Sequence, residues 1–277
     1  MKVIADSSAT RTEWVLVEGD RIREHAFTTG LNPYFQSRRD LSHIIRLELP
    51  EAFFRHRWEH VYFYGAGCAG TEKKKVMASS LVAQFRTPVT VESDLLGAAR
   101  GLLVRRPGVA CILGTGSNSC VYDGTEITRN VPPLGFILGD EGSGAYQGKR
   151  FVADVLKGIA PDGLSQSFFE HFGVSPDMLL DSVYAGAMPS RTLAGYAEFL
   201  SGHLDDGYVY RLVFDGFMSF FERNVARYDY SAGISVVGRT AVRCSPVLDA
   251  AASAFGVRIN KLAPSSMPGL IEYHSND

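Results

Sequence analysis

One short pattern occurs twice in this chain, near residue 3 and again near residue 109, and it constrains the fold more than any other feature. Each time an apolar strand leads into a turn of small and hydroxyl-bearing residues, and a second strand follows. The first copy comprises Val3–Ala5, a polar cluster through Thr10 and Thr12–Val17; the second comprises Val109–Leu113, Gly114–Ser117 and Ser119–Tyr122. A repeated plan of this kind indicates two similar halves.

The rest of the chain mixes strands and helices. A third strand fits Arg21–Thr28, and helical and strand-like stretches then alternate as far as Leu103. The second half is mostly helical, with strands expected at Ile234–Val237 and Val257–Leu262. This pattern predicts an α/β protein with mixed sheets. The linker candidate Arg105–Gly108 divides it into domains 1–107 and 108–277, the second with a helical insertion.

Composition excludes several classes of protein. The chain has 277 residues, and its 28 basic and 30 acidic residues leave no excess of positive charge for nucleic acid. The one basic run, Lys73–Lys75, is interpreted as a solvated helix face. No apolar stretch approaches the ~20 residues of a membrane span, and the first residues do not resemble a signal peptide. The four cysteines form no C-x-x-C pair, so we expect reduced thiols in a cytoplasmic protein.

The first turn carries residues that suit a phosphate group. Asp6 ends an apolar run, small hydroxyl residues follow, and Arg11 supplies a cation. Backbone N–H groups and hydroxyls of such a turn can bind phosphate oxygens, and Asp6 can hold Mg²⁺ directly or through water. An ordinary polar hairpin is the alternative for this segment alone.

The second turn reads Gly114-Thr115-Gly116-Ser117-Asn118. Its two glycines allow the backbone to approach a ligand closely, and its hydroxyls add donors. A tight hairpin without a ligand is again the alternative. Two such turns at the heads of two matching halves could face each other across a cleft and hold one polyphosphate.

Two carboxylate positions complete the candidate site. Asp140 and Glu141 lie among four glycines just before a predicted helix, which suits recognition of sugar hydroxyls or coordination through water. A surface loop is the alternative there. Asp94 follows an apolar strand at a strand-to-helix switch, where active-site carboxylates of α/β proteins often lie. It could equally be a helix N-cap with no further role.

Together these segments resemble the sugar kinase, heat-shock chaperone and actin ATPase superfamily, in its N-acetylglucosamine kinase-like and BadF/BadG/BcrA/BcrD-type ATPase branch. The resemblance spans nearly the whole chain. It is carried by Asp6–Trp14, Gly30–Pro33, Gly65–Cys68, Ser93-Asp94, Gly114–Asn118, Leu138–Ser143, Val237-Gly238 and Gly269–His274.

The resemblance implies two ribonuclease-H-like domains, the actin-like ATPase fold, with ATP and Mg²⁺ in the cleft between them. Asp94 then matches the catalytic base. The expected nucleotide-binding residues are Asp6, Ser7, Ser8, Thr10, Arg11, Thr12, Gly114, Thr115, Gly116, Val237, Gly238 and Arg239. The expected residues for the amino sugar are Asn32, Ser117, Asn118 and Asp140.

The family pattern has two departures in this chain. Ser8 and Ala9 stand where the first loop is usually richer in glycine, and Arg239 stands where the adenosine loop usually continues with small residues. The function expected from the resemblance is an ATP-dependent kinase for an N-acetylated amino sugar. A sugar or nucleotide sensor without catalysis and an ATPase that activates a partner enzyme are the alternatives. A homodimer is one state of assembly open to the chain.

Overall fold

The computed structural model describes residues 1–186 and 188–275. The strands are β1 (Lys2–Ser7), β2 (Arg11–Glu18), β3 (Arg21–Thr29), β4 (His60–Gly65), β5 (Val89–Ser93), β6 (Gly108–Leu113), β7 (Ser117–Tyr122), β8 (Ile127–Val131), β9 (Ile234–Val237) and β10 (Ile259–Ala263). The helices are α1 (Arg38–Glu48), α2 (Thr71–Phe85), α3 (Asp94–Leu103), α4 (Gly135–Leu138), α5 (Gly144–Leu156), α6 (Asp162–Phe172), α7 (Pro176–Tyr184), α8 (Pro189–Leu200), α9 (Gly207–Arg223), α10 (Arg239–Arg243), α11 (Ser245–Phe255) and α12 (Met267–Ser275).

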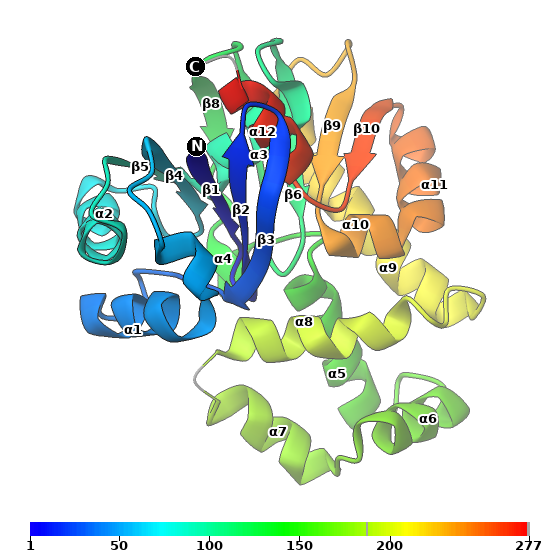
Figure 1. Cartoon of the computed structure of the whole chain (residues 1–277). Coiled ribbons are helices and arrows are strands. Elements are labelled where there is room, and N and C mark those ends of the chain that lie inside the picture. Colours follow the sequence, from blue (N-terminus) through cyan, green and yellow to red (C-terminus); the bar gives the residue numbers. More distant parts are fainter. Residues whose placement is uncertain (187, 276–277) are drawn as a thin grey trace. The chain divides into compact units, whose positions relative to one another are not determined.

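The ten strands form two sheets with the same strand order (Figure 1). The first sheet runs β3-β2-β1-β4-β5 and the second β8-β7-β6-β9-β10. In the first sheet β1, β2 and β3 pair antiparallel, whereas β4 and β5 continue parallel to β1. In the second sheet β9 and β10 are parallel. The α/β class, the mixed sheets and the two similar halves predicted from the repeated pattern are therefore confirmed.

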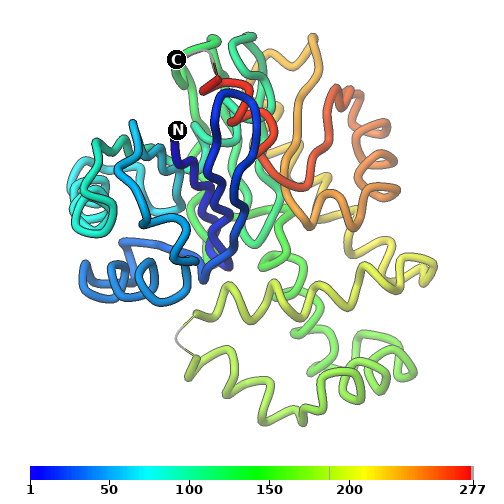
Figure 2. The backbone as a smooth tube through the Cα atoms, in the orientation of Figure 1, coloured from blue at the N-terminus to red at the C-terminus, as the bar shows by residue number. Residues whose placement is uncertain are grey.

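The chain divides into two compact units. The first unit comprises residues 1–110, 120–129 and 265–277, and the second comprises residues 111–119 and 130–264. The C-terminal helix α12 thus belongs to the same unit as the N-terminal strands, and Figure 2 shows the red C-terminal tube beside the blue strands.

The first unit has helices on both faces of its sheet because β1 places apolar side chains on both faces. Val3 and Ala5 point to one face, where they form a core with residues of α1 and α2. Ile4 points to the other face and packs with Met267 and Leu270 of α12. Successive strand residues face opposite sides of a sheet, so a strand that is apolar on both sides needs cover on both sides.

The second unit carries most of the helices. α5 packs against α8 and α9, and α9 packs against α11. One face of α9 belongs to the core of this unit, where Phe217 and Phe221 are fully buried. No helix in the described ranges has the length and apolarity that a membrane crossing needs. All four cysteines are free and buried.

The structure differs from the expected elements in several places, among them β1, β8 and α4. The first strand does not stop at Ala5 but continues through Ser7, because Asp6 and Ser7 pair with Glu13 and Thr12 of β2. β8 was not expected from the sequence, because its residues are mostly exposed and give little hydrophobic signal. α4, a single helical turn within the glycine-rich segment before Asp140, was not expected either.

Candidate active site

The first turn of the candidate site is shorter than expected and is held by its own hydroxyls. Only residues 8–10 lie outside the strands. The Ser8 hydroxyl accepts hydrogen bonds from the backbone N–H groups of Thr10 and Arg11, both at 3.3 Å, and donates to the Arg11 carbonyl at 3.1 Å. The Ser8 side chain therefore already occupies backbone donors that a glycine-rich turn would offer to a phosphate.

Three other residues of this segment have local partners. The Ser7 and Thr12 side chains are fully buried, and their hydroxyl oxygens lie 2.7 Å apart. Ser7 also donates to the Leu31 carbonyl at 3.1 Å, so these hydroxyls support the turn from inside the unit. Arg11 is exposed, and its guanidinium lies 4.3 Å from the centre of the Phe27 ring.

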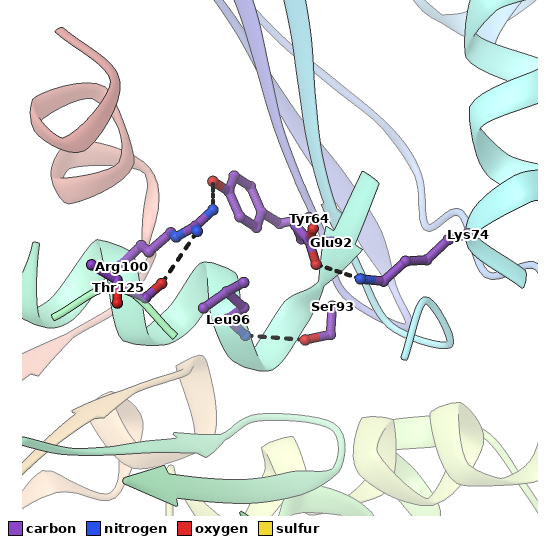
Figure 3. Close-up of polar contacts among 7 residues, drawn as sticks. All are labelled: Tyr64, Lys74, Glu92, Ser93, Leu96, Arg100 and Thr125. Carbon is purple, nitrogen blue, oxygen red and sulfur yellow. Dashed lines mark hydrogen bonds and ion pairs between the residues drawn. The ribbon is translucent and has the colours of Figure 1, made fainter. Parts of the chain in front are cut away.

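Asp94 is the first residue of α3, directly after β5. Ser93 is the N-cap and its hydroxyl accepts the Leu96 N–H at 3.2 Å (Figure 3). The Asp94 carboxylate accepts the Leu95 N–H at 2.9 Å. The N-cap interpretation offered for Asp94 is therefore wrong, because Ser93 takes that role and leaves the Asp94 carboxylate at the first turn of the helix.

Asp94 and Asp6 are both buried carboxyl groups, and the charge of Asp94 acts on Asp6. Burial raises the pKa of Asp94 to about 6, although its hydrogen bond from Leu95 acts in the opposite direction. The pKa of Asp6 is raised to about 7, mainly by burial and also by the charges of Asp94 and Glu13, while hydrogen bonds from Ser266 act in the opposite direction. A carboxyl group with a pKa near neutrality can accept and release a proton at physiological pH.

Three residues around Asp6 were absent from the sequence prediction: Glu13, Ser265 and Ser266. Glu13 lies directly opposite Asp6 in the β1–β2 pairing. Its carboxylate accepts a hydrogen bond from the Ser265 hydroxyl at 2.6 Å and lies 3.0 Å from His25. The alternation of β2 could have marked Glu13 as an inward-facing charge, but no local signal connects it to serines 250 residues away.

Asn32 lies in the loop after β3, largely buried. Its side-chain oxygen accepts the Tyr34 N–H at 2.9 Å, and a Cβ on Gly67 would lie only 2.2 Å from that oxygen. Gly67 has φ 78°, so both its conformation and this close approach require glycine. The Asn32 side-chain NH₂ has no protein partner in the described part of the chain, which leaves a donor for a ligand.

The second turn, in the other unit, is fixed from both sides. The Gly114 N–H donates to the Gly116 carbonyl at 2.9 Å. The carbonyl of Gly114 accepts the Gly144 N–H at 2.8 Å, and that of Thr115 accepts the Ala145 N–H at 3.0 Å. The start of α5 is thus bonded to the turn, so the predicted turn and the helix after Asp140 form one rigid element.

Asp140 lies against this turn. Its carboxylate accepts the Ser117 N–H at 3.2 Å, and a Cβ on Gly116 would lie 3.1 Å from the same group. Asp140 adopts φ 56°, a left-handed conformation uncommon for residues other than glycine. The Pro133 carbonyl, which accepts the Asp140 N–H at 3.0 Å, holds it there. Backbone strain of this kind concentrates at functional sites.

The neighbours of Asp140 have their own partners. Glu141 is largely buried and forms an ion pair with Arg223 at 3.6 Å. The side-chain oxygen of Asn118 accepts hydrogen bonds from the Ser119 N–H and the Asn130 side chain, both at 2.9 Å. Asp140, Ser117 and Asn118, three of the expected sugar-binding residues, therefore lie around one turn of the second unit.

The predicted adenosine loop also lies next to this turn. Gly238 has φ 139°, and a Cβ there would lie 2.2 Å from the Leu113 carbonyl. The Thr240 hydroxyl donates to the Gly114 carbonyl at 2.9 Å. Arg239 lies between these two contacts and begins α10, half-buried. The structure thus brings Val237–Arg239 and Gly114–Gly116 together within the second unit.

The residues around Asp6 fit Mg²⁺ bound together with phosphate. In the described ranges no group of three or more acidic, histidine or cysteine side chains could hold a metal ion by itself. Mg²⁺ at nucleotide sites usually keeps several waters and takes one or two carboxylates plus phosphate oxygens. Asp6, with Glu13 opposite and Asp94 near, offers the concentrated negative charge that such a cation would offset.

Comparison with solved structures supports the family resemblance found in the sequence. A proposed N-acetylglucosamine kinase from Porphyromonas gingivalis is 39% identical in sequence, with all of this chain and 99% of that one aligned at a TM-score of 0.95. A proposed N-acetylglucosamine kinase from Chromobacterium violaceum is 17% identical, with 98% of each chain aligned at a TM-score of 0.72. No protein-family model and no curated protein matches the chain.

A more distant similarity concerns the fold alone. A glucokinase of the ROK family from Streptomyces griseus, solved with glucose and AMPPNP, is 13% identical, with 98% of this chain and 97% of that one aligned at a TM-score of 0.57. These similarities confirm the two-domain, actin-like ATPase fold expected from the sequence.

Proposed function

Because the chain belongs to the N-acetylglucosamine kinase-like branch of the sugar kinase and actin-like ATPase superfamily, we propose that it transfers a phosphoryl group from ATP to a hydroxyl of an N-acetylated amino sugar. The chain is accordingly an ATP-dependent sugar kinase, and the finer proposal concerns the class of sugar and the residues that act on it.

Asp94 is the general base in this proposal. It accepts the proton of the attacking hydroxyl while that oxygen forms its bond to phosphorus. The observation that carries the assignment is the place of Asp94, buried at the head of α3 directly after β5 and within electrostatic range of Asp6; its burial raises its pKa to about 6. Such a carboxylate is ionised at pH 7 yet basic enough to take a proton.

The phosphates are assigned to the two turns. In the first turn, the proposed ligands are backbone N–H groups of residues 7–12, the hydroxyls of Ser8 and Thr10 and the cation of Arg11, and Asp6 would hold Mg²⁺ directly or through water. The buried hydroxyls of Ser7 and Thr12 support this turn from inside the unit. In the second, residues 114–116 supply backbone donors, and Val237–Arg239 contact the adenosine. When bound, Mg²⁺ neutralises phosphate charge. Positioning and electrostatics of this kind supply most of the catalysis in phosphoryl transfer.

The sugar is assigned to Asn32, Ser117, Asn118 and Asp140. Support comes from the Asn32 side-chain NH₂, which can donate to a sugar oxygen, and from the carboxylate of Asp140, which can accept from hydroxyl groups. A carboxylate can accept up to about four hydrogen bonds, which suits the several hydroxyl groups of a sugar.

A coupled ADP-release assay tests the proposal. N-acetylglucosamine, N-acetylmannosamine, N-acetylmuramic acid, glucosamine and glucose are compared at equal concentration with Mg²⁺ and ATP, and Asp94→Asn serves as the matched inactive control. We expect turnover with at least one N-acetylated sugar and at least tenfold slower turnover with glucosamine. Faster turnover of glucose than of every N-acetylated sugar would refute the sugar class.

A sensor without catalysis is the second candidate, and the Ser8 side chain is the observation that favours it. Its hydroxyl occupies the Thr10 and Arg11 N–H groups, which weakens the first turn as a phosphate site. Calorimetry separates the two functions. A sensor binds sugar in the low-millimolar range or tighter and releases no ADP with any of the five sugars. The proposed kinase binds sugar and also releases ADP.

A further inference from the structure

The basic run Lys73–Lys75 lies in the first turns of α2, just after the loop that joins β4 to this helix. The sequence analysis interpreted all three lysines as a solvated face, and for two of them that interpretation is wrong. Only Lys75 behaves as expected: it pairs with Glu72 of the same helix at 3.0 Å, and both side chains are well exposed. Lys73 and Lys74 reach other parts of the first unit.

Lys73 is bonded to the segment that carries Asn32. Its ammonium group donates to the Pro33 carbonyl at 2.8 Å and lies 5.0 Å from the centre of the Tyr34 ring. The Tyr34 N–H in turn donates to the Asn32 side chain. Lys73 therefore fixes the two residues that follow Asn32 and, through Tyr34, the orientation of the Asn32 amide.

Lys74 is bonded to β5, the strand that directly precedes Asp94. Its ammonium group lies 2.5 Å from the Glu92 carboxylate, with 32% of the Lys74 and 27% of the Glu92 side chain exposed (Figure 3). Glu92 precedes Asp94 by two residues, and Ser93 between them is the N-cap of α3. An ion pair that is partly shielded from water restrains its partners more than a fully exposed one does.

The loop before α2 contacts the same two positions. Gly67 lies against the Asn32 side-chain oxygen. Cys68 is fully buried, and its thiol is within electrostatic range of Asp94, Glu92 and Lys74. Asn32 and Asp94 are far apart in the chain, yet the contacts around both involve residues 67–74, which comprise the loop before α2 and the first turn of that helix.

We infer that Lys73 and Lys74 are positioning residues of the sugar kinase reaction, Lys73 for Asn32 and Lys74 for Asp94. The inference rests on the proposed function for the roles of Asn32 and Asp94. Because the two lysines are neighbours on one helical turn, α2 keeps the sugar-binding amide and the general base in register with each other. Lys75, on the same turn but without such a contact, provides the matched control.

Methionine variants separate the three lysines, because methionine keeps much of the apolar stem and removes the charge. Lys73→Met is expected to raise the KM for sugar about fivefold and to leave kcat within twofold. Lys74→Met is expected to lower kcat about tenfold and to leave KM within twofold, since small displacements of a catalytic group are costly. Lys75→Met changes neither value more than twofold, and Lys74→Arg, which keeps the charge, recovers most of kcat.

A double-mutant cycle tests whether Lys74 acts through Glu92. Glu92→Gln alone is expected to lower kcat to a similar degree as Lys74→Met. The kcat of the variant with both substitutions should then be no lower than that of the worse single variant, because the same contact is broken in all three variants. Losses that multiply would overturn the assignment, as would equal effects of Lys74→Met and Lys75→Met on kcat.

Hydrogen exchange provides a measurement that does not need activity. Lys73→Met is expected to speed exchange of the Phe35 and Gln36 amides, which donate to the Asn32 carbonyl. Lys74→Met is expected to speed exchange of the Leu96 amide, which donates to the Ser93 hydroxyl. Lys75→Met should change neither. If the wild type phosphorylates no sugar, the proposed function fails while these exchange rates still decide the positioning. Equal changes in these exchange rates in all three variants would mean that the lysines only stabilise the unit in general, and would overturn the inference.

Discussion

Replacing Asp94 with asparagine should make the protein a poorer enzyme and a more stable fold. Asparagine keeps the size of the side chain and can still accept the Leu95 N–H, but it cannot accept a proton. Turnover should therefore fall by roughly 10²–10⁴-fold, the usual contribution of a general base. The gain in stability follows from the charge, because burial disfavours the ionised carboxylate of the wild type.

The size of that gain depends on pH. The pKa of Asp94 is raised from 3.8 to about 6, so the unfolded chain releases this proton at lower pH than the folded chain does. The wild type therefore loses stability relative to the variant as pH rises from about 4 to about 6. At 1.36 kcal/mol per pKa unit the full difference is at most about 3 kcal/mol, and we expect about 1–3 kcal/mol above pH 6 and nearly none at pH 4.

Denaturant unfolding followed by tryptophan fluorescence measures this difference. Both tryptophans, Trp14 and Trp58, are buried in the first unit, which also holds Asp94, so the signal reports on the relevant part of the chain. Asp20→Asn, at an exposed turn position, is the control and should show no such pH dependence. Wild-type turnover should decline below about pH 6.

Two results would refute this reasoning. Turnover of Asp94→Asn close to that of the wild type would remove Asp94 as the base. A variant that is less stable than the wild type at every pH would mean that the Asp94 carboxylate is favourably placed as a charge, contrary to its burial. Because the predicted changes in turnover and stability have opposite signs, unfolding of the variant cannot imitate them.

Three further substitutions test other parts of the site. Asparagine at position 140 tolerates the left-handed backbone. Asp140→Asn should weaken sugar binding, measured by calorimetry, by about 1–3 kcal/mol because it replaces a carboxylate acceptor, and it should change ATP affinity little. Selective loss of ATP binding would contradict the assignment. Ser8→Gly should tighten ATP binding several-fold by releasing backbone N–H groups, and unchanged or weaker binding would show that the Ser8 hydroxyl does not compete. Ser266→Ala removes a hydrogen bond that favours the Asp6 carboxylate, so the pKa of Asp6 should rise above about 7 when followed by NMR of the metal-free protein; an unchanged value would exclude this contact.

Much of the fold could be predicted from local sequence patterns. The apolar alternation in the first strands, the glycines after Leu113 and the apolar faces of the long helices are local properties, so many of the elements were expected near their actual positions. Where the local signal was weak, the prediction failed. β8 was missed because it is mostly exposed, and the end of β1 was placed too early because Asp6 and Ser7 belong to the strand only through their partners in β2.

Parts of the site could also be predicted from the sequence. Asp94 stands out because it follows an apolar strand and begins a helix, and Asp140 because glycines surround it. These signals lie within a few residues of the positions that they mark. Chain order alone could therefore suggest them as candidates, although not their pKa values, which depend on burial and on neighbours in space.

The tertiary structure decided the rest, because the remaining contacts join residues that are distant in the chain. Ser265 and Ser266 reach Glu13 and Asp6 only after the C-terminal segment has returned to the first unit. In the sequence, Lys74 is indistinguishable from Lys75, since both are lysines in one polar run. What separates them is the direction in which each side chain leaves α2: Lys75 points toward solvent, whereas Lys74 meets Glu92 near the end of β5, just before Asp94. Hydrophobic periodicity is set by neighbours along the chain, but the partner of a charged side chain is set by packing.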